Sequence, residues 1–260
     1  MFKNFLIIFL LTISINNNAF AVEIWNSENG ISRLNSSQYK NDFYQLANFY
    51  QAQNNPIHCS SATGLILKNA LFYENIPSQA NSEITKPNGE IIPFKLYASQ
   101  ENFFNEKTDK IKSREIIFYK KPKIVENNDG TKVEYFDPGL NLKDFAKILK
   151  THKIKSKIFY QETNSETDLS KFRDIAKKVL NDKNSFLVAN FDGKVFGNKT
   201  GGHISPIVAY DEKSDSLLVL DVALHKNPWY WVDLKEMATA MNTKDGDNFR
   251  GYLIANKSWF

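Results

Sequence analysis

The chain contains a single cysteine, Cys59, among its 260 residues. One thiol cannot form a disulfide within the chain, and it excludes the two-thiol chemistry of C-x-x-C oxidoreductases. In an oxidising compartment a lone thiol is a liability unless it is buried, paired between chains or used in chemistry. Cys59 is therefore a candidate nucleophile, and the alternative is that it is a small buried hydrophobic residue.

Histidine is also scarce, with four residues in the chain, and no two have metal-site spacing such as H-x-x-x-H. A structural zinc site is thus unsupported, and we expect no resident cofactor. A thiolate–metal binding protein using Cys59, His203 and His225 is the weakest alternative. Of the other two, His58 adjoins Cys59 and should point elsewhere, whereas His152 lies in a lysine-rich turn and should be solvated.

Neither positive nor negative charge is in large excess: the chain has 33 Lys and Arg and 29 Asp and Glu, so its net charge is +4. Acidic residues lie between many of the lysines, which is typical of a solvated surface and not of a nucleic-acid groove. Long hydrophobic runs are also missing. The apolar run at residues 5–13 is too short to span a bilayer comfortably, so we expect no membrane anchor.

The N-terminal 21 residues have the parts of a secretory signal: Lys3, the apolar run, and an A-x-A site at residues 19–21. Cleavage there would make Val22 the first mature residue and would place the protein in the periplasm or outside the cell. No cysteine lies near the site, so a lipoprotein anchor is not expected. We interpret residues 22–260 as one catalytic domain.

Residue periodicity predicts an α+β fold. Apolar residues at helical spacing predict helices at about 43–50, 59–73, 142–149 and 172–180. Apolar runs bounded by turns predict strands at 185–191, 203–210, 217–222 and 251–255. The short turn between the second and third strands makes them adjacent and antiparallel. Residues 75–139 are the least readable, with one hairpin expected from 123–125 and 132–135.

The surroundings of Cys59 favour chemistry. Pro56 fixes its own φ angle and pushes Asn55 out of the α region, so an extended lead-in gives way to a helix at Cys59. Unpaired N–H groups and the positive end of the helix dipole point at a residue in this position and favour a thiolate.

A second candidate group lies far downstream. Gly201-Gly202 leads into a strand that begins with His203, and Asp221 ends the apolar run of the next strand. Burying a carboxylate in that position costs free energy unless it has a hydrogen-bond partner, and the ring N–H of His203 is a suitable donor. Such a carboxylate orients the base of a nucleophilic triad. The alternatives are a structural histidine and a capping aspartate. A cysteine helix followed by a distant histidine is the papain-type order, although papain's local signature is absent.

These motifs resemble phytochelatin synthases, and more closely the half-length bacterial members that consist of the catalytic domain only. The most specific part is Gly-His-x-Ser-Pro followed by Leu-Asp-Val. Matching segments lie at 53–71, 201–206, 218–226 and 250–252. The resemblance is weak or absent at 76–139, which looks longer than in relatives, and Ser60-Ser61 replaces the usual Gly-Leu after the cysteine.

The resemblance implies a papain-like fold in which Cys59 is the nucleophile, His203 the general base and acid, and Asp221 its orienting partner. It implies glutathione as the substrate. Cys59 would attack the carbonyl between cysteine and glycine, release glycine and retain a γ-glutamylcysteinyl thioester. No cofactor is implied, heavy-metal ions would enter as thiolate complexes of the substrate, and a homodimer is allowed.

The resemblance also assigns substrate contacts. Gln53 would be an oxyanion-hole donor beside the Cys59 backbone N–H. Gly202 and Arg250 would contact substrate, with Arg250 as a bidentate carboxylate clamp; the alternative is an ordinary surface arginine. Family members commonly have an arginine where this chain has Leu224.

Because Leu224 cannot bind a carboxylate, the favoured function is an exported glutathione-cleaving thiol acyltransferase that acts mainly as a hydrolase. One rival is true phytochelatin synthesis, in which a second glutathione intercepts the thioester. Another is a papain-like peptidase or amidase with a different substrate.

Overall fold

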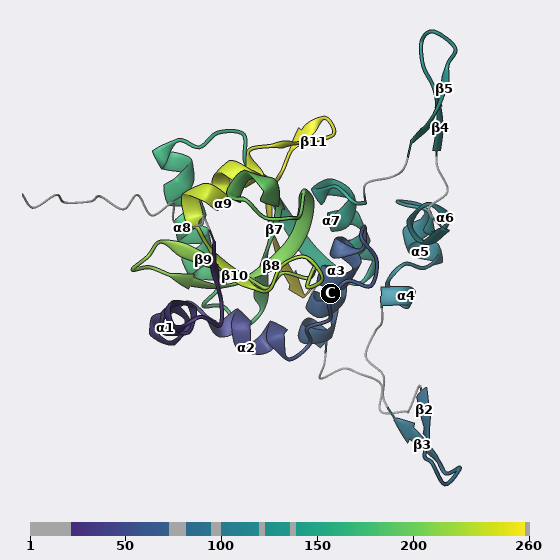
Figure 1. Cartoon of the computed structure of the whole chain (residues 1–260), viewed down its shortest axis with the longest axis horizontal. Coiled ribbons are helices and arrows are strands. Elements are labelled where there is room, and N and C mark those ends of the chain that lie inside the picture. Colours follow the sequence, from purple (N-terminus) through teal and green to yellow (C-terminus); the bar gives the residue numbers. More distant parts are fainter. Residues whose placement is uncertain (1–21, 73–81, 95–99, 120–122, 136–138, 258–260) are drawn as a thin grey trace, which may run out of the picture.

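The computed structural model describes residues 22–72, 82–94, 100–119, 123–135 and 139–257 (Figure 1). The expected signal segment lies outside the described residues. Among the helices of the described ranges, none has the length and apolar character needed to cross a bilayer.

A seven-stranded sheet forms the centre of the fold, in the order β1-β10-β9-β8-β7-β13-β6. All six neighbouring pairs are antiparallel. The strands are β1 (Val22–Ile24), β6 (Ile154–Tyr160), β7 (Ser185–Asp192), β8 (Gly202–Asp211), β9 (Ser216–Val219), β10 (Tyr230–Asp233) and β13 (Gly251–Lys257). The chain is therefore α+β with an antiparallel sheet, as the sequence predicted.

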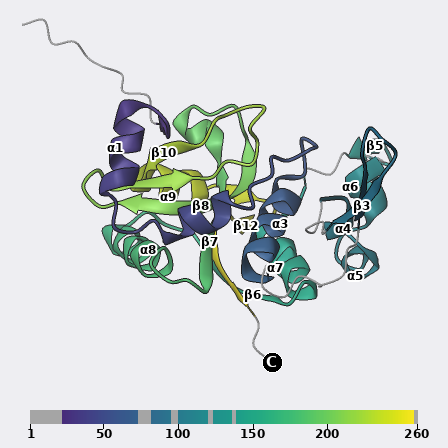
Figure 2. The same ribbon diagram turned by 90° about the horizontal axis from the view of Figure 1, so that it is seen from below.

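Helices cover both faces of this sheet (Figures 1 and 2). On β7, Phe186 and Val188 belong to one core and Leu187 and Ala189 to the other, because successive side chains of a strand point to opposite faces. The first core contains α1 (Glu28–Ser36), α2 (Asn41–Ala47), α3 (Cys59–Phe72) and α7 (Leu142–Thr151). The second contains α8 (Glu166–Val179), η2 (Gly193–Phe196) and α9 (Leu234–Met241).

The predicted helices and strands are confirmed, with one correction at β9. The run 217–222 was expected to be a single strand, but β9 ends at Val219. The Leu220 N–H donates to the Pro206 carbonyl (2.9 Å), and Val222 then accepts from the Gln53 N–H (2.8 Å). The chain thus leaves the ladder of β8 so that residues 221–222 reach the loop before Cys59.

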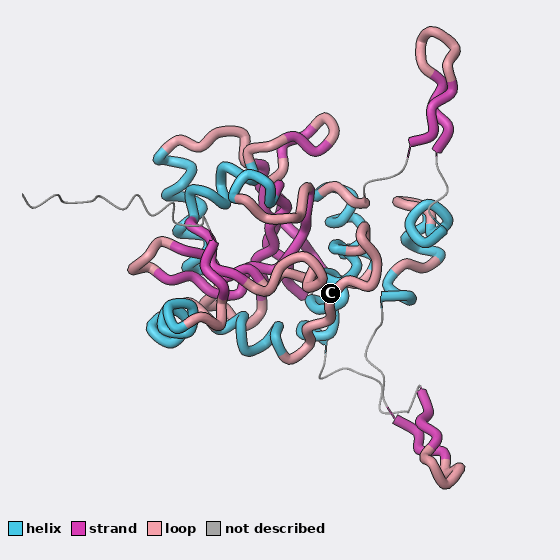
Figure 3. The backbone as a smooth tube through the Cα atoms, in the orientation of Figure 1, coloured by secondary structure: helices cyan, strands magenta, loops and turns pink. Residues whose placement is uncertain are grey.

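Residues 82–94, 100–119 and 123–135 lie on the side of α3 and α7 that faces away from α8 (Figures 1 and 2). The hairpin predicted there is confirmed as β4 (Lys123–Glu126) paired with β5 (Lys132–Tyr135). A second hairpin was not predicted and joins β2 (Ser82–Thr85) to β3 (Ile91–Phe94). Between the hairpins are three short helices (Figure 3), namely α4 (Gln100–Phe103), α5 (Glu106–Asp109) and α6 (Arg114–Tyr119).

Candidate active site

Cys59 is the first residue of α3, as the sequence predicted. Its side chain is buried, and most of α3 is buried around it. One turn further along, the Thr63 hydroxyl donates to the Ile204 carbonyl at 2.9 Å and fixes the helix to β8. Because Ile204 follows His203, this bond places the start of α3 against the strand that carries the histidine.

His203 and Asp221 are in direct contact. The distance from His203 Nε2 to Asp221 Oδ1 is 2.8 Å, and both side chains are almost completely buried. Asp221 Oδ1 also accepts from the Ala223 N–H (2.7 Å), and Ser205 Oγ lies 2.9 Å from His203 Nε2. A buried carboxylate with two such donors is held in one orientation, so Nε2 is fixed on Asp221 and Nδ1 is the ring nitrogen left for other chemistry.

The pKa of His203 depends on both Asp221 and Cys59. Burial alone would disfavour the imidazolium, but the Asp221 charge and hydrogen bonds to Asp221 and Cys59 outweigh it and raise the pKa of His203 to about 10. At neutral pH the histidine is therefore protonated beside the thiol.

Cys59 and His203 both line a small cavity of about 130 Å³. It is lined by Cys59, Gly139, Leu140, Asn190, Gly202, His203, Ile204, Asp245 and Arg250. Sites that hold a drug-sized ligand usually span ~300–1,000 Å³. This cavity is thus smaller than a typical site for a whole drug-sized ligand.

Arg250 is partly buried and lines the cavity, so the alternative of an ordinary surface arginine is wrong. Its side chain is 12% exposed, and Nη1 lies 3.0 Å from Asp245 Oδ2 and 3.3 Å from Asn190 Oδ1. A Cβ on Gly202 would lie 2.7 Å from Arg250 Nη2, so a larger residue at this position would displace the guanidinium. The structure brings Gly202 and Arg250 together at the cavity, and their contact with a substrate stays a prediction.

Gln53 lies on the loop before Cys59, but its side chain is not among those lining the cavity. Its Nε2 donates to the Asn55 carbonyl at 2.8 Å. Its Oε1 is buried and has no hydrogen-bond partner within the described part of the chain. A primary amide has two N–H groups, and the bond to Asn55 occupies one of them, so the oxyanion role of Gln53 stays a prediction.

Asn190, Asp245 and Leu140 also line the cavity, although the sequence pattern predicts no role for them. Asn190 could have been found, because it is a polar residue within the apolar run of β7. Asp245 lies on β11 (Lys244–Asp245), which pairs with β12 (Asn248–Phe249). Two-residue strands leave no periodic pattern to detect.

The other histidines lie outside the cavity. His58 is buried with Nδ1 3.0 Å from Asn54 Oδ1, in agreement with the expectation that it points elsewhere. His225 is exposed. The described residues contain no group of three or more His, Cys, Asp or Glu that could hold a metal ion.

The prediction that His152 is solvated is wrong. Its ring stacks on Phe103 with centroids 4.4 Å apart, and Nε2 lies 2.8 Å from the Phe103 carbonyl oxygen. Burial and the nearby charges of Lys68 and Lys107 lower its pKa to about 4. The lysines next to His152 in sequence suggested a surface turn, but the contact with Phe103 comes from a distant segment.

This burial predicts a pH-dependent stability. His152 has a pKa of about 4 when folded, against an ordinary value of 6.5, so the unfolded chain takes up the proton first. Neutral His152 therefore leaves the free energy of unfolding unchanged above pH 6.5. As the pH falls toward 4, protonation of the unfolded chain lowers this free energy by about 3 kcal/mol. Urea titrations at pH 7 and pH 4 should show that His152→Phe loses less stability over this interval than the wild type. Equal losses would contradict the assignment.

The fold and site define an antiparallel α+β domain in which a lone buried thiol shares a cavity with an arginine and with a histidine that is paired to a buried aspartate. Residues 18–252 match the family model described as phytochelatin synthase, and the chain belongs to that family.

Three relatives illustrate the similarity. Glutathione gamma-glutamylcysteinyltransferase 3 of Lotus japonicus is 28% identical over 83% of this chain and 37% of its own length. Glutathione gamma-glutamylcysteinyltransferase 1 of Arabidopsis thaliana is 25% identical over the same shares. The Schizosaccharomyces pombe enzyme is 29% identical over 45% of this chain and 28% of its own length. The chain spans a little over a third of the plant relatives it matches.

Proposed function

We propose that this chain transfers the γ-glutamylcysteinyl group of glutathione through a thioester on Cys59. The observation that carries the proposal is the buried His203–Asp221 pair, whose histidine lines the same cavity as the only cysteine of the sequence. The three relatives are all glutathione gamma-glutamylcysteinyltransferases by name, which supports glutathione as the substrate.

In the first half-reaction the imidazolium of His203 favours the thiolate of Cys59, which attacks the carbonyl carbon between cysteine and glycine. The carbon–nitrogen bond then breaks. His203 donates its Nδ1 proton to the departing glycine amine, while Asp221 holds the ring through Nε2. Glycine leaves and the thioester remains.

In the second half-reaction neutral His203 takes a proton from the acceptor, which is either water or the amine of a second glutathione. The acceptor attacks the thioester carbonyl, and the Cys59 thiolate leaves. Each cycle returns the thiolate and the imidazolium, so no cofactor is consumed.

Three groups would support this chemistry. The backbone N–H of Cys59 and the second N–H of Gln53 would stabilise the oxyanion, a type of interaction whose removal costs about 100- to 1000-fold in turnover. Arg250 would bind a substrate carboxylate, because Asn190 and Asp245 hold its guanidinium plane at the cavity.

The same arrangement supports a papain-like domain over residues 22–260. A buried helix that begins with the nucleophile packs against an antiparallel sheet. The histidine lies on β8, and the aspartate follows β9. The order of cysteine, histidine and aspartate along the chain agrees with this proposal.

The experiment that tests the function is incubation with millimolar glutathione, followed by mass spectrometry of the products. We expect the release of one glycine for each γ-glutamylcysteinyl group transferred, together with either γ-glutamylcysteine or longer γ-glutamylcysteinyl peptides. If glutathione remains intact while other peptides or amides are cleaved, the chain is a peptidase or amidase with a different substrate.

Hydrolysis is a second outcome for the same thioester, and Leu224 favours it. This side chain is 53% exposed and cannot bind the carboxylate of an incoming glutathione. A charge-assisted contact of that kind contributes about 1.5–3 kcal/mol, which is roughly tenfold or more in affinity. A weakly held acceptor competes poorly with water.

We therefore expect γ-glutamylcysteine and glycine as the main products of the wild type, with and without cadmium. Leu224→Arg should shift the products toward oligomers, as measured in a chromatographic time course. Oligomers that dominate from the earliest wild-type points would contradict the hydrolytic outcome and leave the transferase as the function.

We further propose that the protein is exported. The support is the charged start, the apolar run at 5–13 and the A-x-A site at 19–21. N-terminal sequencing of the native protein should begin at Val22, and a retained Met1 would refute the proposal.

A further inference from the structure

We propose that Gln100, in the segment between the two hairpins, is a positioning residue that fixes Gln53 for oxyanion stabilisation. The inference rests on the proposed function and adds to it a residue outside the cavity. Its evidence is a pair of hydrogen bonds that spans Gln53.

Gln100 bonds the residues on both sides of Gln53. Its Nε2 donates to the Ala52 carbonyl at 2.8 Å, and its Oε1 accepts from the Asn54 N–H at 3.1 Å. The side chain is 5% exposed, so these bonds are protected from water. The side-chain amide of Gln100 thus bonds one backbone carbonyl and one backbone N–H of an irregular loop. In a sheet, the backbone of a neighbouring strand would make these two bonds.

The opposite side of the loop is held by the segment that carries Asp221. The Gln53 N–H donates to the Val222 carbonyl at 2.8 Å, and Val222 directly follows the carboxylate. The backbone at Gln53 is therefore fixed between Gln100 and the histidine–aspartate pair. Rotation of this short stretch would move the Gln53 amide relative to the cavity.

The same loop leads directly to the nucleophile. Asn54 Oδ1 lies 3.0 Å from His58 Nδ1, and the His58 N–H donates to the Asn55 carbonyl at 3.0 Å. His58 precedes Cys59. Gln100 thus acts on the loop that carries both the oxyanion donor and the start of α3.

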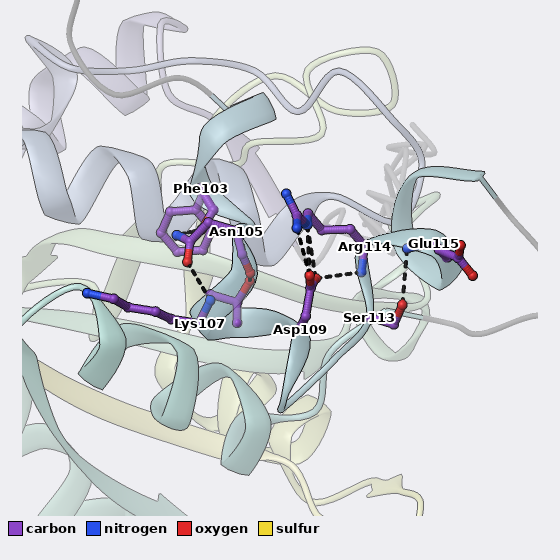
Figure 4. A network of polar contacts seen from close by, with 8 residues as sticks. Phe103, Asn105, Lys107, Asp109, Ser113, Arg114 and Glu115 are labelled. Atoms are coloured by element: carbon purple, nitrogen blue, oxygen red, sulfur yellow. Dashed lines mark hydrogen bonds and ion pairs between the residues drawn. The ribbon is translucent and has the colours of Figure 1, made fainter.

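Gln100 is itself anchored on α3. Phe103, one turn later on α4, packs so closely on Gly64 that a Cβ there would lie 2.2 Å from Phe103 Cζ. His152 stacks on the same ring. The segment then continues with its own internal bonds, namely the Asn105 cap of α5 and the Asp109–Arg114 pair (Figure 4). These later bonds do not involve the loop and provide a matched control.

The first test is the steady-state kinetics of Gln100→Ala. Loss of an oxyanion donor costs about 100- to 1000-fold. Misplacing Gln53 should forfeit part of this, so we expect kcat for glycine release to fall about tenfold or more, with KM changed less than about twofold. Arg114→Ala, which breaks the pair with Asp109 in the same segment, should change kcat less than about twofold.

The second test is a double-mutant cycle with Gln53→Ala. If Gln100 acts through Gln53, the double variant should be no slower than Gln53→Ala alone, because the lost donor cannot be lost twice. Independent, multiplicative losses would overturn the inference. So would an unchanged kcat in Gln100→Ala.

A third measurement does not depend on activity. Hydrogen exchange at the Gln53 and Asn54 amides should accelerate in Gln100→Ala and stay unchanged in Arg114→Ala. If the wild type released no glycine, the proposed function would be wrong. The effect of Gln100 on hydrogen exchange at the Gln53 and Asn54 amides could still be measured. Unchanged exchange in Gln100→Ala would overturn the inference whatever the activity.

Discussion

Replacement of Cys59 by alanine should abolish glycine release from glutathione, with a loss in turnover of at least about 10⁴-fold. The chain has no second thiol, so no other cysteine can form the thioester. The Cys59 side chain is small and lies at the helix start, so alanine should preserve α3. The measurement is the initial rate of glycine release, with circular dichroism to confirm the fold.

Cys59→Ser is the matched variant, because it keeps the size and a hydrogen-bonding group but lacks the nucleophilicity of a thiolate. We expect a loss nearly as large as that of Cys59→Ala. A rate close to that of the wild type in Cys59→Ala would show that the thiol is only a buried hydrophobic side chain.

Changes in the histidine–aspartate pair should have the second largest effect. His203→Ala removes the proton carrier, and Asp221→Asn leaves the ring without its charged partner; in an enzyme with a comparable triad such a substitution costs about 10⁴-fold in turnover. Asp221→Asn should also lower the pKa of His203, because the carboxylate charge counters the effect of burial. NMR titration of the His203 ring and the rate of glycine release measure these two effects.

Ser205→Ala is the control for this pair. Ser205 Oγ lies 2.9 Å from His203 Nε2 and accepts from the Val222 N–H at 3.3 Å, but it carries no charge. Its loss should cost far less than the loss of Asp221. A near-normal rate in Asp221→Asn would mean that the carboxylate is structural.

The pairing of His203 with Asp221 could be predicted because it depends on local pattern. Two apolar runs joined by a short turn become the neighbours β8 and β9. A glycine pair precedes His203 on β8, and the carboxylate of Asp221 follows the end of β9 by two residues. The cysteine helix was equally readable, since Pro56 and the apolar spacing after Cys59 define its start.

The rest of the site depends on contacts between distant segments. Arg250 was recognisable only by resemblance, and its partner Asp245 lies on a hairpin too short for a pattern. His152 was misjudged because its neighbours in sequence are lysines, whereas Phe103 covers it in the fold. Gln100 lies in the least readable part of the chain, and its two bonds to the loop at Gln53 leave no trace in periodicity.

The central claim is that Cys59 carries the γ-glutamylcysteinyl group, and intact-protein mass spectrometry after rapid acid quenching tests it most directly. Wild-type protein mixed with glutathione should gain the mass of one γ-glutamylcysteinyl group, which peptide mapping should locate on Cys59. Cys59→Ala should gain nothing. Glycine release from glutathione with no such group on Cys59 at any time would contradict the account.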